Sequence, residues 1–249
     1  MVYKVYGIYD ITNDLAIETP SYIVNTKYNK RSGIVEYSRT SKSKGETVLN
    51  KVISGGIRLH INPVHPILLP ICMTRHILVI IENPVSLAPG DIIEGYITIP
   101  VDIAVYVEEY NEAITLIDIF TEGKIKYTLY GPLEGGHLAR YHRTRFYSQE
   151  PRTKPFTEAL VRITISNRST YWITLSKILI DCKHLKLYYD PPHNAYAQAL
   201  EIVVTSRRHA KVIYSTPFKT AVIEAQRPPM FRFTKSYLTL HGTLMKWGV

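Results

Sequence analysis

The fold class follows from one stretch of the sequence, Leu160-Val161-Arg162-Ile163-Thr164-Ile165-Ser166, in which apolar and polar side chains alternate. Successive side chains of an extended chain point to opposite faces, so Val161, Ile163 and Ile165 share one face. The two polar residues between them share the other face. This period of two predicts a β-strand with one buried side.

A partner strand is expected directly after this one, over residues 171–180. The intervening Asn167-Arg168-Ser169-Thr170 is rich in turn-forming residues, so the two strands should form a hairpin. Trp172, Ile178 and Ile180 would lie on one face of the second strand. We therefore expect Trp172 to be buried between two sheets, as in an Ig-like sandwich.

The rest of the chain repeats this pattern of strands and turns. Short runs rich in Val, Ile, Thr and Tyr recur about every 8–12 residues, and stretches with helical periodicity are scarce. The sequence predicts a meander over residues 102–109, 113–120 and 124–130, and a strand pair formed by residues 200–206 and 211–216. It therefore predicts an all-β protein of two Ig-like antiparallel β-sandwich modules with very little helix.

The chain is long enough for two domains, because 249 residues exceed a typical domain of about 100–150. We expect residues 1–110 to form an N-terminal sandwich module and residues 111–249 a C-terminal one. Within the first module, residues 27–51 carry seven Lys and Arg against two Glu, and no apolar face can be drawn through residues 39–46. This stretch is therefore expected to be an exposed basic loop or hairpin tip.

The charge balance indicates the sign of a partner. The chain has 30 Lys and Arg against 21 Asp and Glu, a formal net charge of +9, which attracts acidic proteins, anionic surfaces and nucleic acid. The alternative is a basic surface that serves solubility alone. Residues 1–7 lack the apolar core of a signal peptide, and no apolar run approaches the ~18 residues of a membrane span, so we expect a cytoplasmic protein.

No motif for catalysis or cofactor binding is recognisable. The pairs Gly55-Gly56 and Gly135-Gly136 lack the Gly-Lys-Ser/Thr of a phosphate-binding loop and are better explained as turns or bulges. A Gly-x-Ser-x-Gly nucleophile motif is absent. Cys72 and Cys182 stand outside any CxxC or thiol-protease motif, and whether they pair is left open. We expect a protein without enzymatic activity and without a cofactor.

Candidates for metal and acid–base sites have little support. Two histidine pairs have a spacing of five, His60 with His65 and His137 with His142. On an extended backbone this spacing points the two rings to opposite faces, so we expect no metal site. Asp118 with Glu122 could form the carboxylate pair of a glycosidase, but spacing along strands carries little information about such pairs. Carboxylates on a solvated rim are the preferred interpretation.

One segment, residues 127–147, interleaves tyrosines with arginines and histidines, as surfaces that bind anions or stack on bases do. On a strand over residues 138–147, Arg140 and Arg143 would lie on opposite faces, and neither face would be apolar. This is typical of an edge or a ligand surface, and arginines in structural ion pairs are the alternative. The predicted anion- or partner-binding residues are Tyr127, Tyr130, Arg140, Tyr141, His142, Arg143, Arg145 and Tyr147.

Six features, in this order, carry a family resemblance: Asn62-Pro63-Val64 with Pro66 and Pro70, residues 78–89, Ile117-Asp118-Ile119-Phe120, Lys126-Tyr127-Thr128-Leu129-Tyr130-Gly131, Arg140-Tyr141 with Phe146-Tyr147, and residues 160–187 around Trp172. Over most of residues 55–205 the chain resembles an uncharacterised archaeal domain family of unknown function. The resemblance implies an archaeal, thermophilic origin and no catalytic residues to carry over. It also implies a place beside membrane channels of the mechanosensitive type, as a soluble accessory protein.

These observations favour a non-catalytic cytoplasmic interaction module. Its basic surface, rich in Tyr and Arg, would bind an acidic protein partner or an anionic surface. A nucleic-acid- or ribosome-associated factor is the first alternative, favoured by the charge but without an RRM, KH or zinc-finger signature. A carbohydrate-active β-sandwich enzyme is the second, because sandwiches host many functions.

Overall fold

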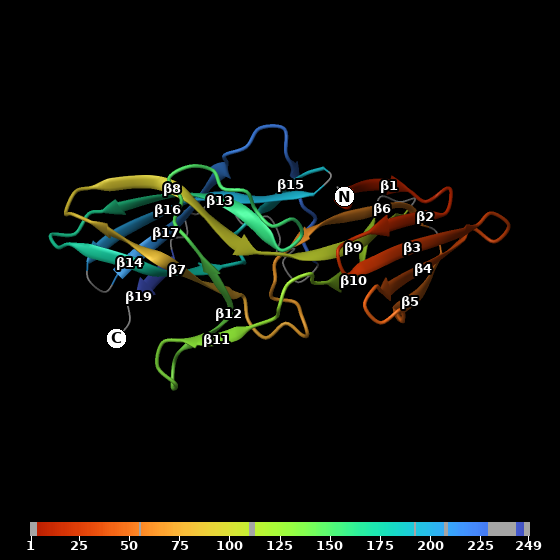
Figure 1. Ribbon diagram of the computed structural model, residues 1–249, viewed down its shortest axis with the longest axis horizontal. Helices are drawn as coiled ribbons and strands as arrows, with labels where there is room; N and C mark the ends of the chain where they lie inside the picture. Colours follow the sequence, from red (N-terminus) through yellow and green to blue (C-terminus); the bar gives the residue numbers. More distant parts are fainter. Residues whose placement is uncertain are drawn as a thin grey trace.

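The computed structural model describes residues 4–54, 56–109, 113–191, 193–206, 209–228 and 243–246, and every regular element in these ranges is a β-strand (Figure 1). The predicted all-β class is therefore confirmed. The strands form four sheets. Two of the sheets make up the half of the molecule that contains the N-terminus, and the other two make up the second half (Figure 1).

The N-terminal half consists of two four-stranded sheets. The first has the order β1 (Gly7–Asp10), β6 (Gly56–Val64), β9 (Asp102–Glu109), β10 (Ile114–Phe120). The second is an antiparallel meander of β2 (Leu15–Glu18), β3 (Tyr22–Asn29), β4 (Ile34–Ser41) and β5 (Thr47–Ser54). Apolar side chains from both sheets, such as Val35 of β4 and Val105 of β9, are buried in one core.

The second half has one four-stranded and one seven-stranded sheet. The smaller sheet has the order β11 (Tyr127–Tyr130), β12 (His137–Thr144), β7 (His76–Leu87), β14 (Ile173–Asp181). The larger has the order β18 (Ile223–Glu224), β15 (Leu187–Asp190), β16 (Asn194–Ser206), β13 (Glu158–Asn167), β8 (Ile92–Pro100), and β17 (His209–Pro217) joins β16 to β19 (Thr243–Lys246). Two pairings, β12 with β7 and β13 with β16, are parallel.

In the described residues the chain passes between the two halves after β6, after β8 and after β10, and the passage from β8 into β9 is the shortest of these. β8 pairs with β13 in the larger sheet, and β9, which follows almost at once, pairs with β6 in the N-terminal half. Residues 97–107 are buried on both faces of this passage. The pairing therefore does not follow a single cut between residues 110 and 111, since β7 and β8 belong with later strands and β9 and β10 with earlier ones.

The expected hairpin over residues 160–180 is wrong. β13 pairs with β8 and β16, whereas β14 pairs with β7 in the other sheet. Between them the side-chain amide of Asn167 donates to three backbone oxygens at 2.8–3.2 Å, two of them where β7 ends, and so fixes a corner at which the chain changes sheets. Trp172 lies at this corner and is 71% exposed, so its predicted burial is wrong as well.

Of the other expected strand pairings, one is confirmed and one is only partly correct. The pair formed by residues 200–206 and 211–216 is confirmed as β16 and β17. Of the expected meander, β9 and β10 do pair, but β11 pairs with β12 instead of β10. The reason is that the chain crosses from one half of the molecule to the other between β10 and β11 (Figure 1).

The basic loop expected at residues 27–51 consists largely of strands. It spans the end of β3, all of β4 and the start of β5, and Val35, Tyr37 and Arg39 of β4 are buried at alternate positions. The sequence analysis missed this alternation because a charged residue such as Arg39 is normally expected to face solvent. In the folded protein this charge is neutralised in the interior.

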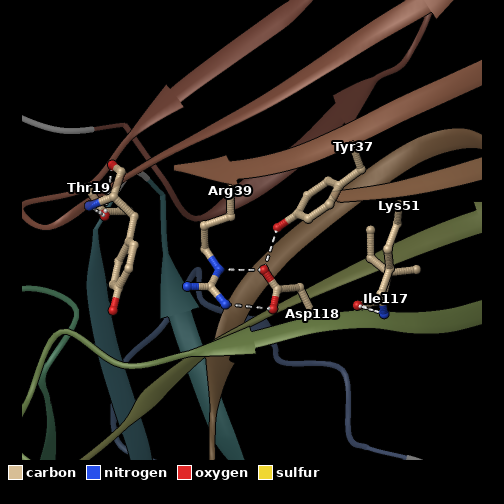
Figure 2. Close-up of polar contacts among 7 residues, drawn as sticks. Thr19, Tyr37, Arg39, Lys51, Ile117 and Asp118 are labelled. Atoms are coloured by element: carbon tan, nitrogen blue, oxygen red, sulfur yellow. Dashed lines mark hydrogen bonds and ion pairs between the residues drawn. The ribbon is translucent and has the colours of Figure 1, made fainter. Parts of the chain in front are cut away.

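A buried ion pair joins the two sheets of the N-terminal half (Figure 2). Arg39 on β4 donates from Nε to Oδ2 of Asp118 on β10 at 2.7 Å, and from Nη2 to Oδ1 at 3.3 Å. The Tyr37 hydroxyl donates to the same Oδ2 at 2.8 Å. The guanidinium carbon also lies 4.8 Å and 5.0 Å from the ring centroids of Tyr22 and Phe120. Because both charges are paired and hydrogen-bonded, their burial is tolerated.

We predict that Asp118→Ala destabilises the protein by about 3–5 kcal/mol, because it leaves the Arg39 guanidinium buried without its counter-ion. The free energy of unfolding, measured in urea, tests this. The double variant Arg39→Met, Asp118→Ala removes both charges and should recover a large part of the loss. A loss below about 1 kcal/mol in the single variant would show that the pair is exposed to water, as surface ion pairs are.

We predict that Trp172→Ala changes the free energy of unfolding by less than about 0.5 kcal/mol, because its ring is mostly in solvent. Phe120→Ala, which removes a ring that is 3% exposed, serves as the matched control. It should cost about 3–5 kcal/mol. Equal losses for the two variants in thermal or urea unfolding would contradict the exposed corner.

Candidate functional site

β12 carries most of the predicted binding residues, and its alternation divides them between two environments. Arg140 and His142 point into the protein, toward β8 of the larger sheet, together with Thr144. Arg143, on the opposite face, is exposed, and so is Arg145 just beyond the strand. The expected single surface is therefore split, with Arg140 buried and His142 half-buried on the inward face.

Arg140 is an interior residue, 2% exposed. Its Nη2 donates to the Lys124 backbone oxygen at 3.2 Å, and its guanidinium carbon lies 5.6 Å from the centroid of the Tyr127 ring. Nε and Nη1 are buried without a hydrogen-bond partner in the described part of the chain. Arg140 is thus unavailable to a partner at the surface.

The tyrosines of β11 are held by the body of the protein. The Tyr127 hydroxyl donates to the Leu69 backbone oxygen at 2.6 Å, and the Tyr130 ring packs against the core. Burial raises the pKa of both phenols. Both side chains therefore support the hairpin, and their rings are only partly open to a partner.

His142 is a half-buried side chain that is neutral at neutral pH. Its Nε2 lies 3.1 Å from Oγ1 of Thr98 on β8, whose hydroxyl is also 3.0 Å from that of Thr144. Burial lowers the pKa of His142 to about 4, and the positive charges of Lys154 and Arg140 act in the same direction. At neutral pH this side chain contributes hydrogen bonding between the two sheets and no charge.

Asp102, which was not among the predicted residues, is a buried acidic group near Arg140. It opens β9 and is fully buried. Burial raises the pKa of its carboxyl to about 6, and the nearby Thr121 hydroxyl and Arg140 guanidinium counteract part of this increase. The neighbouring Tyr6 phenol has a raised pKa, first because of burial and then because of Asp102 and Glu122. A charged residue at the start of an apolar run was the sequence signal for this position.

The outer face of the hairpin keeps fewer predicted residues. Arg143 is exposed and forms an ion pair with Glu82 at 3.2 Å. Arg145 is exposed, and no ion pair involves it in the described ranges. Tyr141 and Tyr147 are half-buried, and the Tyr147 backbone exchanges hydrogen bonds of 2.8 Å and 2.9 Å with Tyr96 on β8.

The sequence analysis missed the hairpin tip. Leu133 is 92% exposed in the turn between β11 and β12. Gly131 has a φ of +101°, which other residues rarely adopt, and a Cβ on Gly136 would lie 2.6 Å from the Pro132 oxygen. The two glycines therefore fix a tight turn, and the Leu133 side chain in this turn is almost entirely exposed. An isolated leucine among turn residues was the available signal.

Further exposed apolar side chains lie on the same part of the molecule. The loop before β7 is tied to the hairpin by the Tyr127–Leu69 bond and by a hydrogen bond from the Thr74 hydroxyl to the Leu138 oxygen. We call the hairpin patch the set of Ile71, Met73, Leu129 and Leu133, with exposed fractions of 67%, 51%, 40% and 92%. Lys124 and Lys126, both exposed, directly precede β11, the strand that carries Leu129.

The candidate metal and acid–base residues have other contacts. His60 lies 2.6 Å from Glu108, the ring nitrogen of His65 donates to the Leu185 oxygen, and the His137 ring packs against His76. No cluster of three or more His, Cys, Asp or Glu suited to a metal occurs in the described ranges. Asp118 is bound to Arg39, and Glu122 accepts from the Ser21 backbone. The two cysteines are both free thiols.

Comparison with known proteins gives one match. A family model described as "Protein of unknown function (DUF432)" matches residues 5–246. The expectation of an uncharacterised domain family is confirmed. No curated protein and no solved structure matches the chain. In the described residues no helix is long and apolar enough to cross a membrane.

We predict that Asp102→Asn stabilises the protein increasingly as pH rises from about 4 to 6. The folded protein keeps a proton on Asp102 up to about pH 6, whereas the unfolded chain loses it near 3.8. Between these values the folded state binds more protons, so wild-type stability falls as pH rises, and the variant avoids this loss. The difference should reach about 2–4 kcal/mol above pH 6.

Urea unfolding of both proteins from pH 4 to 8 measures this difference directly. Burial lowers the pKa values of His65 and His142 to about 4. These two groups therefore reduce the stability of the protein as pH falls, which is opposite in sign to the effect of Asp102. They are present in both proteins and cancel in the comparison. The exposed Asp91→Asn is the control, and a pH-independent effect of Asp102→Asn would contradict a carboxylate buried in this way.

Proposed function

Since the chain belongs to the DUF432 family of proteins of unknown function, its role must be sought in its own surfaces, and we propose that it is a non-catalytic interaction module that docks on an anionic membrane surface through the β11–β12 hairpin. One observation carries the proposal. The hairpin projects from the body of the protein (Figure 1), and Leu133 at its tip is 92% exposed.

The hairpin patch supplies the apolar part of the docking surface. Soluble proteins normally expose large apolar side chains singly, whereas here Leu133 and Leu129 are accompanied by Ile71 and Met73 of the adjoining loop. A protruding leucine needs a deep matching pocket on a protein partner. A bilayer needs no such pocket, because an apolar side chain can insert into the boundary between headgroups and acyl chains.

The charges next to the patch fit an anionic surface. Between residues 124 and 147 the exposed charged groups are Lys124, Lys126, Arg143 and Arg145 against Glu134. Arg143 is paired with Glu82, and no ion pair of the described residues uses the other three cations. Each free Lys or Arg near an anionic leaflet contributes about 1 kcal/mol. A few such charges with a small apolar insertion give reversible binding.

We propose no catalytic role for the protein. Asp118, one of the two carboxylates considered for acid–base chemistry, is bound to Arg39. An acidic protein partner, including a membrane channel to which the chain would be an accessory, stays a prediction. The same holds for the nucleic-acid and carbohydrate alternatives.

We predict that the protein binds vesicles of phosphatidylcholine mixed with phosphatidylserine and not vesicles of phosphatidylcholine alone. Lys124→Ala with Lys126→Ala removes about 2 kcal/mol of attraction and should weaken binding about 30-fold. Leu133→Asp should abolish binding, because it places a carboxylate where the apolar tip enters the bilayer. Vesicle co-sedimentation at several salt concentrations measures all three proteins, and wild-type binding should weaken with salt.

Matched variants on other surfaces provide the controls. Lys27→Ala with Lys30→Ala makes the same charge change at exposed positions of the N-terminal half, and Ile92→Asp places a carboxylate at another exposed apolar position, 66% accessible. Neither should alter binding. An equal loss in the Lys27 and Lys30 variant would show that net charge alone governs binding, and binding of single-stranded RNA but not of vesicles would favour the nucleic-acid alternative. Either result contradicts docking through the hairpin.

A further inference from the structure

β5 is an edge strand that contributes no fully buried side chain to the core. It pairs with β4 on one side, and no described strand pairs with its other side. Of the described strands with eight or more residues, it is the one without a buried side chain. An eight-residue edge with free backbone N–H and C=O groups is a template for another strand.

The one lysine of β5, which could prevent pairing with another strand, points toward the facing sheet instead of outward. Proteins often place lysine on edge strands to prevent pairing. Lys51, the lysine of β5, instead turns toward the facing sheet and donates from Nζ to the Ile117 backbone oxygen of β10 at 2.5 Å (Figure 2). Leu49 and Ile53, on the same inward side, pack against the core.

The outward face of β5 is therefore uncharged. It carries Val48, Asn50 and Val52, and the two valines are 53% and 70% exposed. The three residues are symmetrical about Asn50. In an antiparallel pair of two identical strands centred on Asn50, each Val48 lies opposite Val52 of the second copy, and the two Asn50 side chains lie opposite each other.

We propose that two copies of this chain associate through β5, in antiparallel register centred on Asn50, so that the two meanders form one continuous sheet. The self-complementarity of the outward face is what selects a second copy as the occupant. With a two-fold axis at Asn50, Val48 and Val52 of each copy both have an apolar cross-strand neighbour in the other copy. Centring on Lys51 would instead place each exposed Val52 opposite an asparagine.

Two double variants at the same positions test the interface and its register. In Val48→Lys, Val52→Lys, the proposed register places lysine opposite lysine at both cross-strand pairs, so dimerisation should be lost. In Val48→Lys, Val52→Glu, each lysine faces a glutamate of the second copy, so dimerisation should be retained. Sedimentation equilibrium over a wide range of protein concentrations measures the state of wild type and both variants.

Thermal unfolding first confirms that both variants fold, as expected for side chains that are more than half exposed. A wild type that stays monomeric at every concentration would overturn the proposal. So would a dimer that survives in the lysine–lysine variant, because the interface would then lie elsewhere. Loss of the dimer in both variants would rule out the register centred on Asn50.

Cross-linking gives an independent measurement. In a Cys72→Ser background, which removes the exposed native thiol, Asn50→Cys places two thiols directly opposite each other and should form a disulfide-linked dimer under mild oxidation. Glu36→Cys in the same background, at an exposed position on the neighbouring β4, is the matched control and should stay monomeric. Equal cross-linking of both variants would indicate random collision and contradict the proposed pairing.

Discussion

The structure depends on the passage of residues 97–107 from β8 into β9 with both faces buried. A strand covered on two sides requires a packed layer on each side, which no single hairpin can supply. β8 obtains its neighbours from the second half of the molecule, and β9 obtains them from the first. Among the described strands, those of each half are therefore not consecutive along the chain, and the larger of the two core clusters contains residues of both halves.

This passage also determines where polar side chains must go. Thr98 and Asp102 lie within the buried run and need polar neighbours from facing elements. The inward face of β12 provides hydrogen bonds to Thr98 from His142 and Thr144. For Asp102, whose carboxylate has no hydrogen-bond partner in the described residues, it provides the charge of Arg140, which lowers the pKa of Asp102 against the effect of burial. Arg140 is consequently used in the interior, and the arginines exposed on and just beyond β12 are Arg143 and Arg145.

The hairpin patch and the β5 edge both expose apolar side chains, but the lysines near them have different environments. Near the hairpin patch, Lys124 and Lys126 are exposed to solvent, which gives that part of the surface a positive charge. At β5, Lys51 is drawn to the Ile117 oxygen, which leaves an uncharged strand edge. The first arrangement suits an anionic surface, and the second suits an identical strand. A count of lysines along the chain does not distinguish them.

The sequence by itself determined the all-β class, the pairing of β16 with β17 and the opposite faces of Arg140 and Arg143, because side-chain alternation and turn residues act over a few neighbouring residues. Only the tertiary structure decided which strands share a sheet. The Asn167 corner resembles a hairpin turn locally, yet it sends β13 and β14 into different sheets and leaves Trp172 exposed. Burial of Arg39 and Asp102 was likewise decided by distant partners, since the free energy of a buried charge depends on groups that the chain brings together only on folding.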